Sequence, residues 1–98
     1  MTDPDIRFIA QLENIVRARL LEGAPDSYTV SLVASGTKRI AQKVGEEAVE
    51  LALAAVTEND QETIDEAADL VYHLLVLLSE RGLSIADVAT RLETRHAD

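Results

Sequence analysis

The sequence has 98 residues, of which 47% are hydrophobic and only 3% aromatic, and its formal net charge is −9. A chain of this length accommodates one core, so we expect residues 1–98 to form a single domain. The lack of cysteine excludes disulfides, thiolate zinc sites and cysteine nucleophiles. The acidic excess argues against nucleic acid as a partner, because that interface needs a basic surface.

Hydropathy gives no sign of a membrane partner. The amino terminus is acidic and is not followed by an apolar run, so we expect no signal peptide and a cytoplasmic location. The longest apolar stretch, 70–78, is too short to span a bilayer. An aliphatic composition with four Gly and two Pro favours helices over sheets.

Hydrophobic periodicity predicts two helices in the first third of the chain. Asp3 and Pro4 are expected to provide the N-cap and first position of a helix that ends at Gly23. Ser27 is expected to cap a short helix that Gly36 terminates.

Two longer helices are predicted in the middle of the chain. The first runs over 38–56, and the second, capped by Asn59 or Asp60, runs over 61–81. Gly82 is expected to end the second of these helices.

A capping-box pattern at Ser84 to Asp87 opens a last predicted helix, so the fold class is all-α, with four or five helices in a bundle. Apolar residues surround the helix almost completely over 70–78. Since so small a chain cannot bury them all alone, we expect a homodimer to complete the bundle.

Charged side chains gather on one side of the helix predicted for 38–56. An offset of about 100° per residue places five of them within an arc of about 100°: Arg39, Lys43, Glu46, Glu47 and Glu50. Most other positions are apolar or small, so we expect this helix to be buried, with its charged stripe lining a cleft. Mid-helix Gly45 costs roughly 1 kcal/mol relative to Ala and suggests close approach by another helix or a ligand.

The helix predicted for 61–81 carries a matching stripe. Glu62, Glu66, Asp69 and His73 fall within an arc of about 60°. Acidic groups this close repel one another, and divalent cations would supply the missing positive charge. The stripes offer Glu-x-x-Glu and Glu-x-x-Asp pairs, whose hard oxygen donors favour Mg²⁺ or Mn²⁺ over zinc or di-iron.

Each of these features has a simpler interpretation. The stripe of the first long helix is also compatible with a solvated face that carries Lys43–Glu47 and Arg39–Glu46 ion pairs. His73 fits a hydrogen-bonded core histidine or a residue that supports Asp69. Capping and packing explain Tyr28 and Thr29 as easily as substrate contact does.

Two motifs resemble those of a known enzyme family. Lys43-x-Gly45-Glu46-Glu47-x-x-Glu50, followed by Glu66-x-x-Asp69, resembles the signature of the all-α nucleoside triphosphate pyrophosphohydrolases. More narrowly, the stretches 27–29, 35–47 and 66–78 and the terminal Leu92-x-x-Arg95-His96 resemble the phosphoribosyl-ATP pyrophosphatases of histidine biosynthesis. The similarity covers residues 27–96.

The resemblance implies an enzyme that hydrolyses 1-(5-phospho-β-D-ribosyl)-ATP to the corresponding AMP and pyrophosphate with Mg²⁺, for which Mn²⁺ could substitute. No organic cofactor is implied. The family's metal ligands would fall on Glu47, Glu50, Glu66 and Asp69. Lys43, with Lys38 and Arg39 as weaker candidates, could contact substrate phosphates, and Glu46 could support the metal ligands or orient the attacking water.

Two alternatives differ in what the site does. A house-cleaning pyrophosphohydrolase of another nucleoside triphosphate would use the same metal ligands and differ only in its base and ribose contacts. A non-catalytic helical dimerisation module would explain the apolar helices but not the clustered carboxylates.

Overall fold

The computed structural model describes residues 5–97, and within that range it contains five helices and no strand. The helices are α1 (Phe8–Glu22), α2 (Tyr28–Ala34), α3 (Thr37–Val56), α4 (Asp60–Glu80) and α5 (Ile85–Arg95). This confirms the predicted all-α class. No helix within residues 5–97 combines the length and apolar character needed to cross a bilayer.

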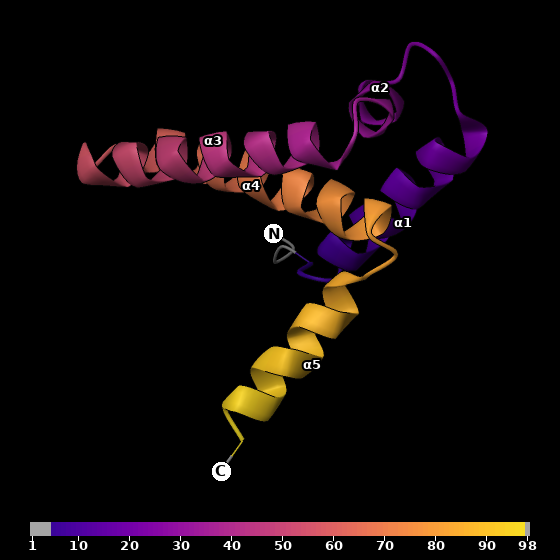
Figure 1. Cartoon of the computed structure of the whole chain (residues 1–98). Helices are drawn as coiled ribbons and strands as arrows, with labels where there is room; N and C mark the ends of the chain where they lie inside the picture. Colours follow the sequence, from indigo (N-terminus) through magenta and orange to yellow (C-terminus); the bar gives the residue numbers. More distant parts are fainter. Residues whose placement is uncertain (1–4, 98) are drawn as a thin grey trace.

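The two long helices form the framework. Figure 1 shows α3 and α4 side by side as an antiparallel hairpin, with α2 at one end and α1 crossing α4. The buried core lies at that end, where Val16 of α1, Leu32 of α2, Ile40 of α3 and Val76 of α4 meet. The core therefore fixes α1 and α2 against the hairpin and leaves the far end of the hairpin uncovered.

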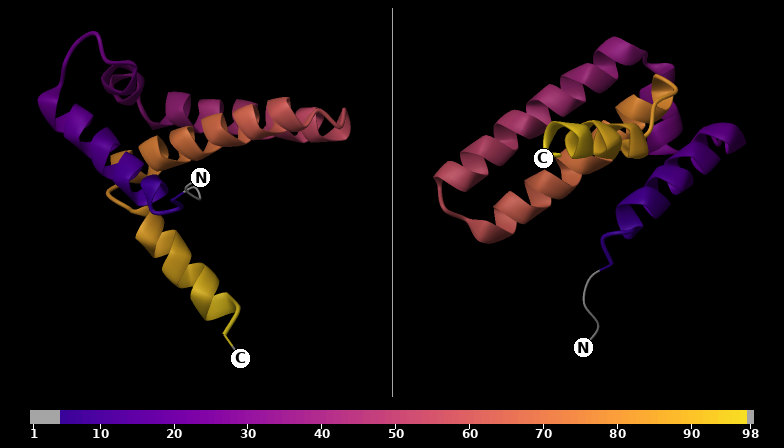
Figure 2. Two further views of the ribbon diagram at one scale, coloured as in Figure 1. Left: turned by 180° about the vertical axis from the view of Figure 1, so that it is seen from behind. Right: turned by 90° about the horizontal axis from the view of Figure 1, so that it is seen from below.

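The helix α5 projects away from the hairpin, as Figure 1 and the left view of Figure 2 show. It is attached through α1, where the buried carboxylate of Glu13 accepts a hydrogen bond of 2.7 Å from the backbone N–H of Ile85. Arg17 reinforces the junction by donating to the carbonyl of Leu83 at 3.2 Å. No residue of α5 is buried, so the predicted bundle is compact only over α1 to α4.

Polar caps define three of the helix starts as predicted. The side chains of Ser27, Asn59 and Ser84 each accept a hydrogen bond from a backbone N–H in the first turn of the helix that follows. Asp87 completes the capping box with Ser84. Because each cap is a contact between near neighbours in sequence, local composition is enough to predict it.

The first helix begins later than predicted. It starts at Phe8, because the Asp5 carboxylate accepts hydrogen bonds from the backbone N–H and from Nε of Arg7 and holds residues 5–7 in a turn. The predicted start at Asp3 and Pro4 lies outside the described residues. Gly23, with a φ of 68°, ends the helix where expected, since glycine adopts left-handed backbone without a Cβ clash.

The predicted burial of the first long helix is wrong for the chain as described. Within α3, only Ile40, Glu47 and Ala54 are buried. This helix packs against α4 along its length and against α2 near its start, and its outer face stays open (Figure 1). Three large apolar residues are therefore exposed on α3: Val49, Leu53 and Val56.

Candidate metal centre

Three carboxylates meet between the two long helices. Glu47 of α3 and Glu66 and Asp69 of α4 each contribute an oxygen, and these oxygens lie within 4.8 Å of one another. Glu66 and Asp69 are one helical turn apart and so share the side of α4 that faces α3. The antiparallel hairpin thus brings together the two acidic stripes that periodicity predicted separately.

Glu50, one turn after Glu47 on α3, joins this cluster through Glu66. A hydrogen bond with Glu50 raises the pKa of Glu66 to about 7, with desolvation of the carboxyl as the next cause. The negative charges of Glu50 and Glu47 raise the pKa further. Below about pH 7 the metal-free cluster therefore holds a proton on Glu66.

The cluster is short of partners for its oxygens. Oε2 of Glu47 and Oε2 of Glu66 are buried and have no hydrogen-bond partner. Leaving a buried carboxylate oxygen unpaired is unfavourable by a few kcal/mol. A divalent cation would satisfy these atoms and offset the repulsion, and an all-oxygen donor set suits a hard cation. The residues present therefore fit a divalent metal.

Both ion pairs expected for a solvated face are present, and the centre itself is partly open to solvent: Glu47 is buried and Glu66 half-buried, whereas Asp69 and Glu50 are exposed. Lys43 Nζ lies 3.5 Å from Glu47 Oε1, and Arg39 lies 3.7 Å from Glu46. Glu47 is only 6% exposed, whereas Glu46 is half-exposed and lies outside the group of carboxylates that meet. Lys38 is exposed at the start of α3. Of the predicted phosphate contacts, only Lys43 pairs with a residue of the centre.

His73 is both a buried core residue and a neighbour of the carboxylates. Its Nδ1 lies 2.8 Å from the backbone carbonyl oxygen of Asp69 and 4.0 Å from Glu47 Oε1. Its Nε2 lies 2.8 Å from the hydroxyl of Tyr28. The contact with Tyr28 joins residues 45 positions apart, so no local pattern in the sequence could have predicted it.

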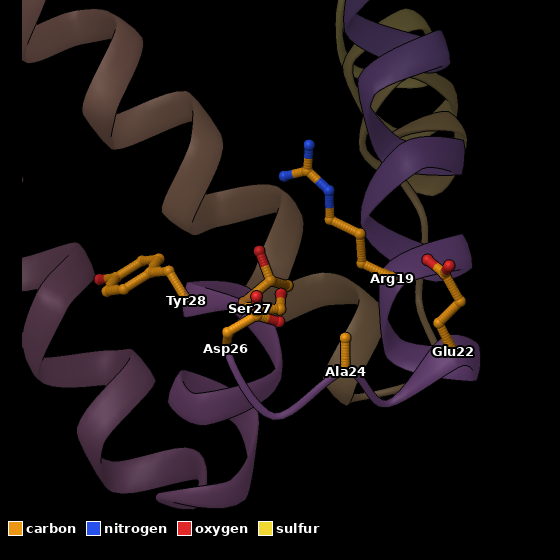
Figure 3. A pocket seen from close by; sticks show the side chains of 7 residues that line it. Arg19, Glu22, Ala24, Asp26, Ser27 and Tyr28 are labelled. Atoms are coloured by element: carbon orange, nitrogen blue, oxygen red, sulfur yellow. The ribbon is translucent and has the colours of Figure 1, made fainter.

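Two hollows lie near these groups. A pocket of about 300 Å³ at the junction of α1 and α2 has Arg19 and Tyr28 on opposite sides (Figure 3) and includes none of the clustered carboxylates. A shallower hollow on α3 is lined by Gly45 and Glu50 with their neighbours. Among residues 5–97, no atom of another helix lies within 4 Å of where a Gly45 Cβ would be, so no described helix makes the predicted close approach.

An all-α chain whose longest helices bring together carboxylates that could hold a divalent cation has the fold and donor set of a metal-dependent helical hydrolase. Comparison with known proteins makes the assignment specific. The profile of the phosphoribosyl-ATP pyrophosphohydrolase family matches residues 9–96, and the chain belongs to that family. The family resemblance predicted from the motifs is confirmed.

Similar proteins include single-function and bifunctional ones. The phosphoribosyl-ATP pyrophosphatase of Pyrobaculum calidifontis is 53% identical over 87 residues, covering 89% of this chain and 93% of that protein. The protein of the same name from Pyrobaculum aerophilum is 54% identical over 85 residues, covering 87% and 90%. The histidine biosynthesis bifunctional protein HisIE of Pasteurella multocida is 55% identical over 95 residues; this chain spans 47% of its length.

Proposed function

We propose that this chain hydrolyses phosphoribosyl-ATP to phosphoribosyl-AMP and pyrophosphate, the second step of histidine biosynthesis. Family membership and relatives of similar length that are named for this pyrophosphatase support the substrate. The observation that carries the chemistry is the convergence of Glu47, Glu66 and Asp69, two of which have buried, unpaired oxygens. Any second activity of the longer bifunctional relatives is outside this proposal. A cytoplasmic location stays a prediction.

The proposed cofactor is Mg²⁺, with Mn²⁺ as a substitute, held by Glu47, Glu50, Glu66 and Asp69. When bound, such an ion supplies charge neutralisation, polarises a phosphoryl oxygen and lowers the pKa of a bound water. The four carboxylates bind it from two helices that the core holds together at one end, so the ligands are positioned before the ion arrives.

The remaining charged residues of α3 are proposed to act on the substrate. Lys43, which already reaches Glu47, would contact a phosphate oxygen at the centre. Arg39 and Lys38, toward the start of α3, would contact phosphates farther out. When Arg39 turns from Glu46 to a phosphate, Glu46 is free to orient the attacking water and accept its proton.

We also propose that two copies form a homodimer. The predicted dimer face at 70–78 is largely covered within the chain, so the argument moves to apolar residues that stay exposed along the hairpin: Val49, Leu53, Val56 and Ile64. Burying these side chains in an interface would stabilise it by about 25 cal/mol per Å² of apolar surface. Sedimentation equilibrium at micromolar concentration should give about twice 10.7 kDa. A mass of one chain at all concentrations would contradict the dimer.

A pyrophosphohydrolase of another nucleoside triphosphate is the remaining alternative, because it would need the same metal ligands. A non-catalytic dimerisation module is disfavoured by the family and by the unpaired carboxylate oxygens. Pyrophosphate release from phosphoribosyl-ATP, ATP and dUTP, each with and without Mg²⁺, separates the three. Release from phosphoribosyl-ATP alone supports the proposed substrate, and no release from any nucleotide supports the module.

A further inference from the structure

The first turn of α2 is attached to α4 by two neighbouring hydrogen bonds. The Tyr28 hydroxyl lies 2.8 Å from Nε2 of His73, and the Thr29 hydroxyl bonds to that of Tyr72. Consecutive residues of α2 thus pair with consecutive residues of α4. Thr29 and His73 are buried, whereas Tyr28 is 52% exposed. Packing alone does not explain why the half-exposed Tyr28 directs its hydroxyl to the buried His73.

The hydrogen bonds of His73 have a direction. Nδ1 lies 2.8 Å from the backbone carbonyl oxygen of Asp69, which can only accept, so Nδ1 carries the hydrogen. In the neutral ring, Nε2 then accepts the hydroxyl hydrogen of Tyr28. The bonds run from Tyr28 through His73 to the Asp69 backbone. Tyr28 therefore contacts the ring at Nε2, and the other ring nitrogen, Nδ1, faces the metal centre.

The imidazole also lies beside the other helix of the centre. Its Nδ1 is 4.0 Å from Oε1 of Glu47, and the ring packs edge-on against both Tyr28 and Tyr72. The ring thus contacts the backbone turn that carries Asp69 while it lies against the carboxylate of Glu47. A shift of the ring would change the space between these two residues, which come from α4 and α3.

We propose that Tyr28 is a positioning residue of the metal centre. Through His73 it holds the turn of Asp69 at a fixed distance from Glu47, against the mutual repulsion of the clustered carboxylates. Mg²⁺ demands near-ideal octahedral geometry, so small shifts of its ligands weaken binding. The inference rests on the proposed function, because it requires that Glu47 and Asp69 hold a cation.

The test compares two tyrosines that differ in their partners. Tyr28→Phe removes the hydroxyl that reaches His73, and Tyr72→Phe removes a hydroxyl whose one partner among residues 5–97 is Thr29. Free Mn²⁺, measured by its electron paramagnetic resonance signal without substrate, gives the dissociation constant of each variant. Loss of a residue that orients a metal ligand typically weakens metal affinity by 10–100-fold. We expect about tenfold weaker Mn²⁺ binding for Tyr28→Phe and unchanged binding for Tyr72→Phe, even where the latter lowers the melting temperature.

A double-mutant cycle checks the route through His73. His73→Asn keeps a donor near the position of Nδ1 but removes Nε2, so Tyr28→Phe should have no further effect on Mn²⁺ affinity in that background. Wild-type affinity in Tyr28→Phe, an equal loss in Tyr72→Phe, or full additivity with His73→Asn would each overturn the inference. Failure of the unmodified chain to bind Mn²⁺ would instead overturn the metal centre, and with it the proposed function.

Discussion

Replacing any one of Glu47, Glu50, Glu66 and Asp69 with its amide should lower turnover by orders of magnitude. Each exchange keeps the side-chain volume and removes one negative oxygen donor from the centre. The metal-free fold should be as stable as before or more stable, because repulsion among the carboxylates is relieved. Steady-state turnover with Mg²⁺ and thermal unfolding in EDTA measure the two effects separately. Activity should fall without loss of fold.

Glu62→Gln is the matched control for Glu66→Gln. Glu62 lies one turn earlier on the same stripe of α4 but is exposed in the first turn of the helix, outside the cluster. An acid there interacts favourably with the helix dipole, so its loss should lower the free energy of unfolding by about 0.3–1 kcal/mol and leave activity nearly unchanged.

The effect of Glu46→Gln on turnover should lie between that of the four ligand variants and that of Glu62→Gln. It should impair turnover more than metal affinity, because Glu46 pairs with Arg39 rather than with the clustered carboxylates. Two results would contradict the assignment: near-normal activity in the four ligand variants, or a loss in Glu62→Gln as large as theirs.

Saturating Mg²⁺ should raise the melting temperature by several degrees or more. A ligand that binds only the folded state adds ~2.7 kcal/mol to the free energy of unfolding at 100 times its dissociation constant. For a domain of this size, each kcal/mol corresponds to roughly 4–8 °C. Differential scanning calorimetry in Mg²⁺ and in EDTA measures the shift. An unchanged melting temperature at millimolar Mg²⁺ and Mn²⁺ would indicate that the clustered carboxylates form an ordinary helix surface that binds no metal.

The gain from Mg²⁺ should also grow with pH. The pKa of Glu66 is raised from 4.5 to about 7 in the folded, metal-free chain, so the folded state holds a proton that the unfolded chain has released. The stability of the metal-free chain therefore falls as pH rises from about 4.5 to about 7. A cation takes the place of that proton, and its binding strengthens over the same range. Melting-temperature gains at about pH 8 should exceed those at about pH 5.5; equal gains would contradict proton release from Glu66.

Helix positions and the composition of the site were predictable because both depend on local sequence. Caps such as Ser84 act within one turn, and the period of 3.6 residues places Glu66 and Asp69 on one face. That these two meet Glu47 depends on how α3 and α4 align as a hairpin, which periodicity does not fix. The family resemblance, and not periodicity, grouped Glu47 with Glu66 and Asp69 as expected metal ligands.

Other features depend on contacts between distant residues. Glu46 and Glu47 share the predicted arc, but only Glu47 is buried, because a turn of about 100° separates a side chain facing α4 from one facing outward. Val49 and Leu53 belong to the apolar positions of α3 that periodicity predicted to be buried, yet no described helix covers them. Tyr28 reaches His73 only after α2 has packed against α4.

Turnover of phosphoribosyl-ATP by the purified chain is the most direct test of the proposed activity. With Mg²⁺ present, one pyrophosphate and one phosphoribosyl-AMP should form per substrate consumed, and EDTA should stop the reaction. The value of kcat/KM should exceed those for ATP and dUTP by about 100-fold or more if the site binds the second ribose through polar contacts. Equal or better turnover of ATP or dUTP, or release of orthophosphate in place of pyrophosphate, would contradict the proposed function.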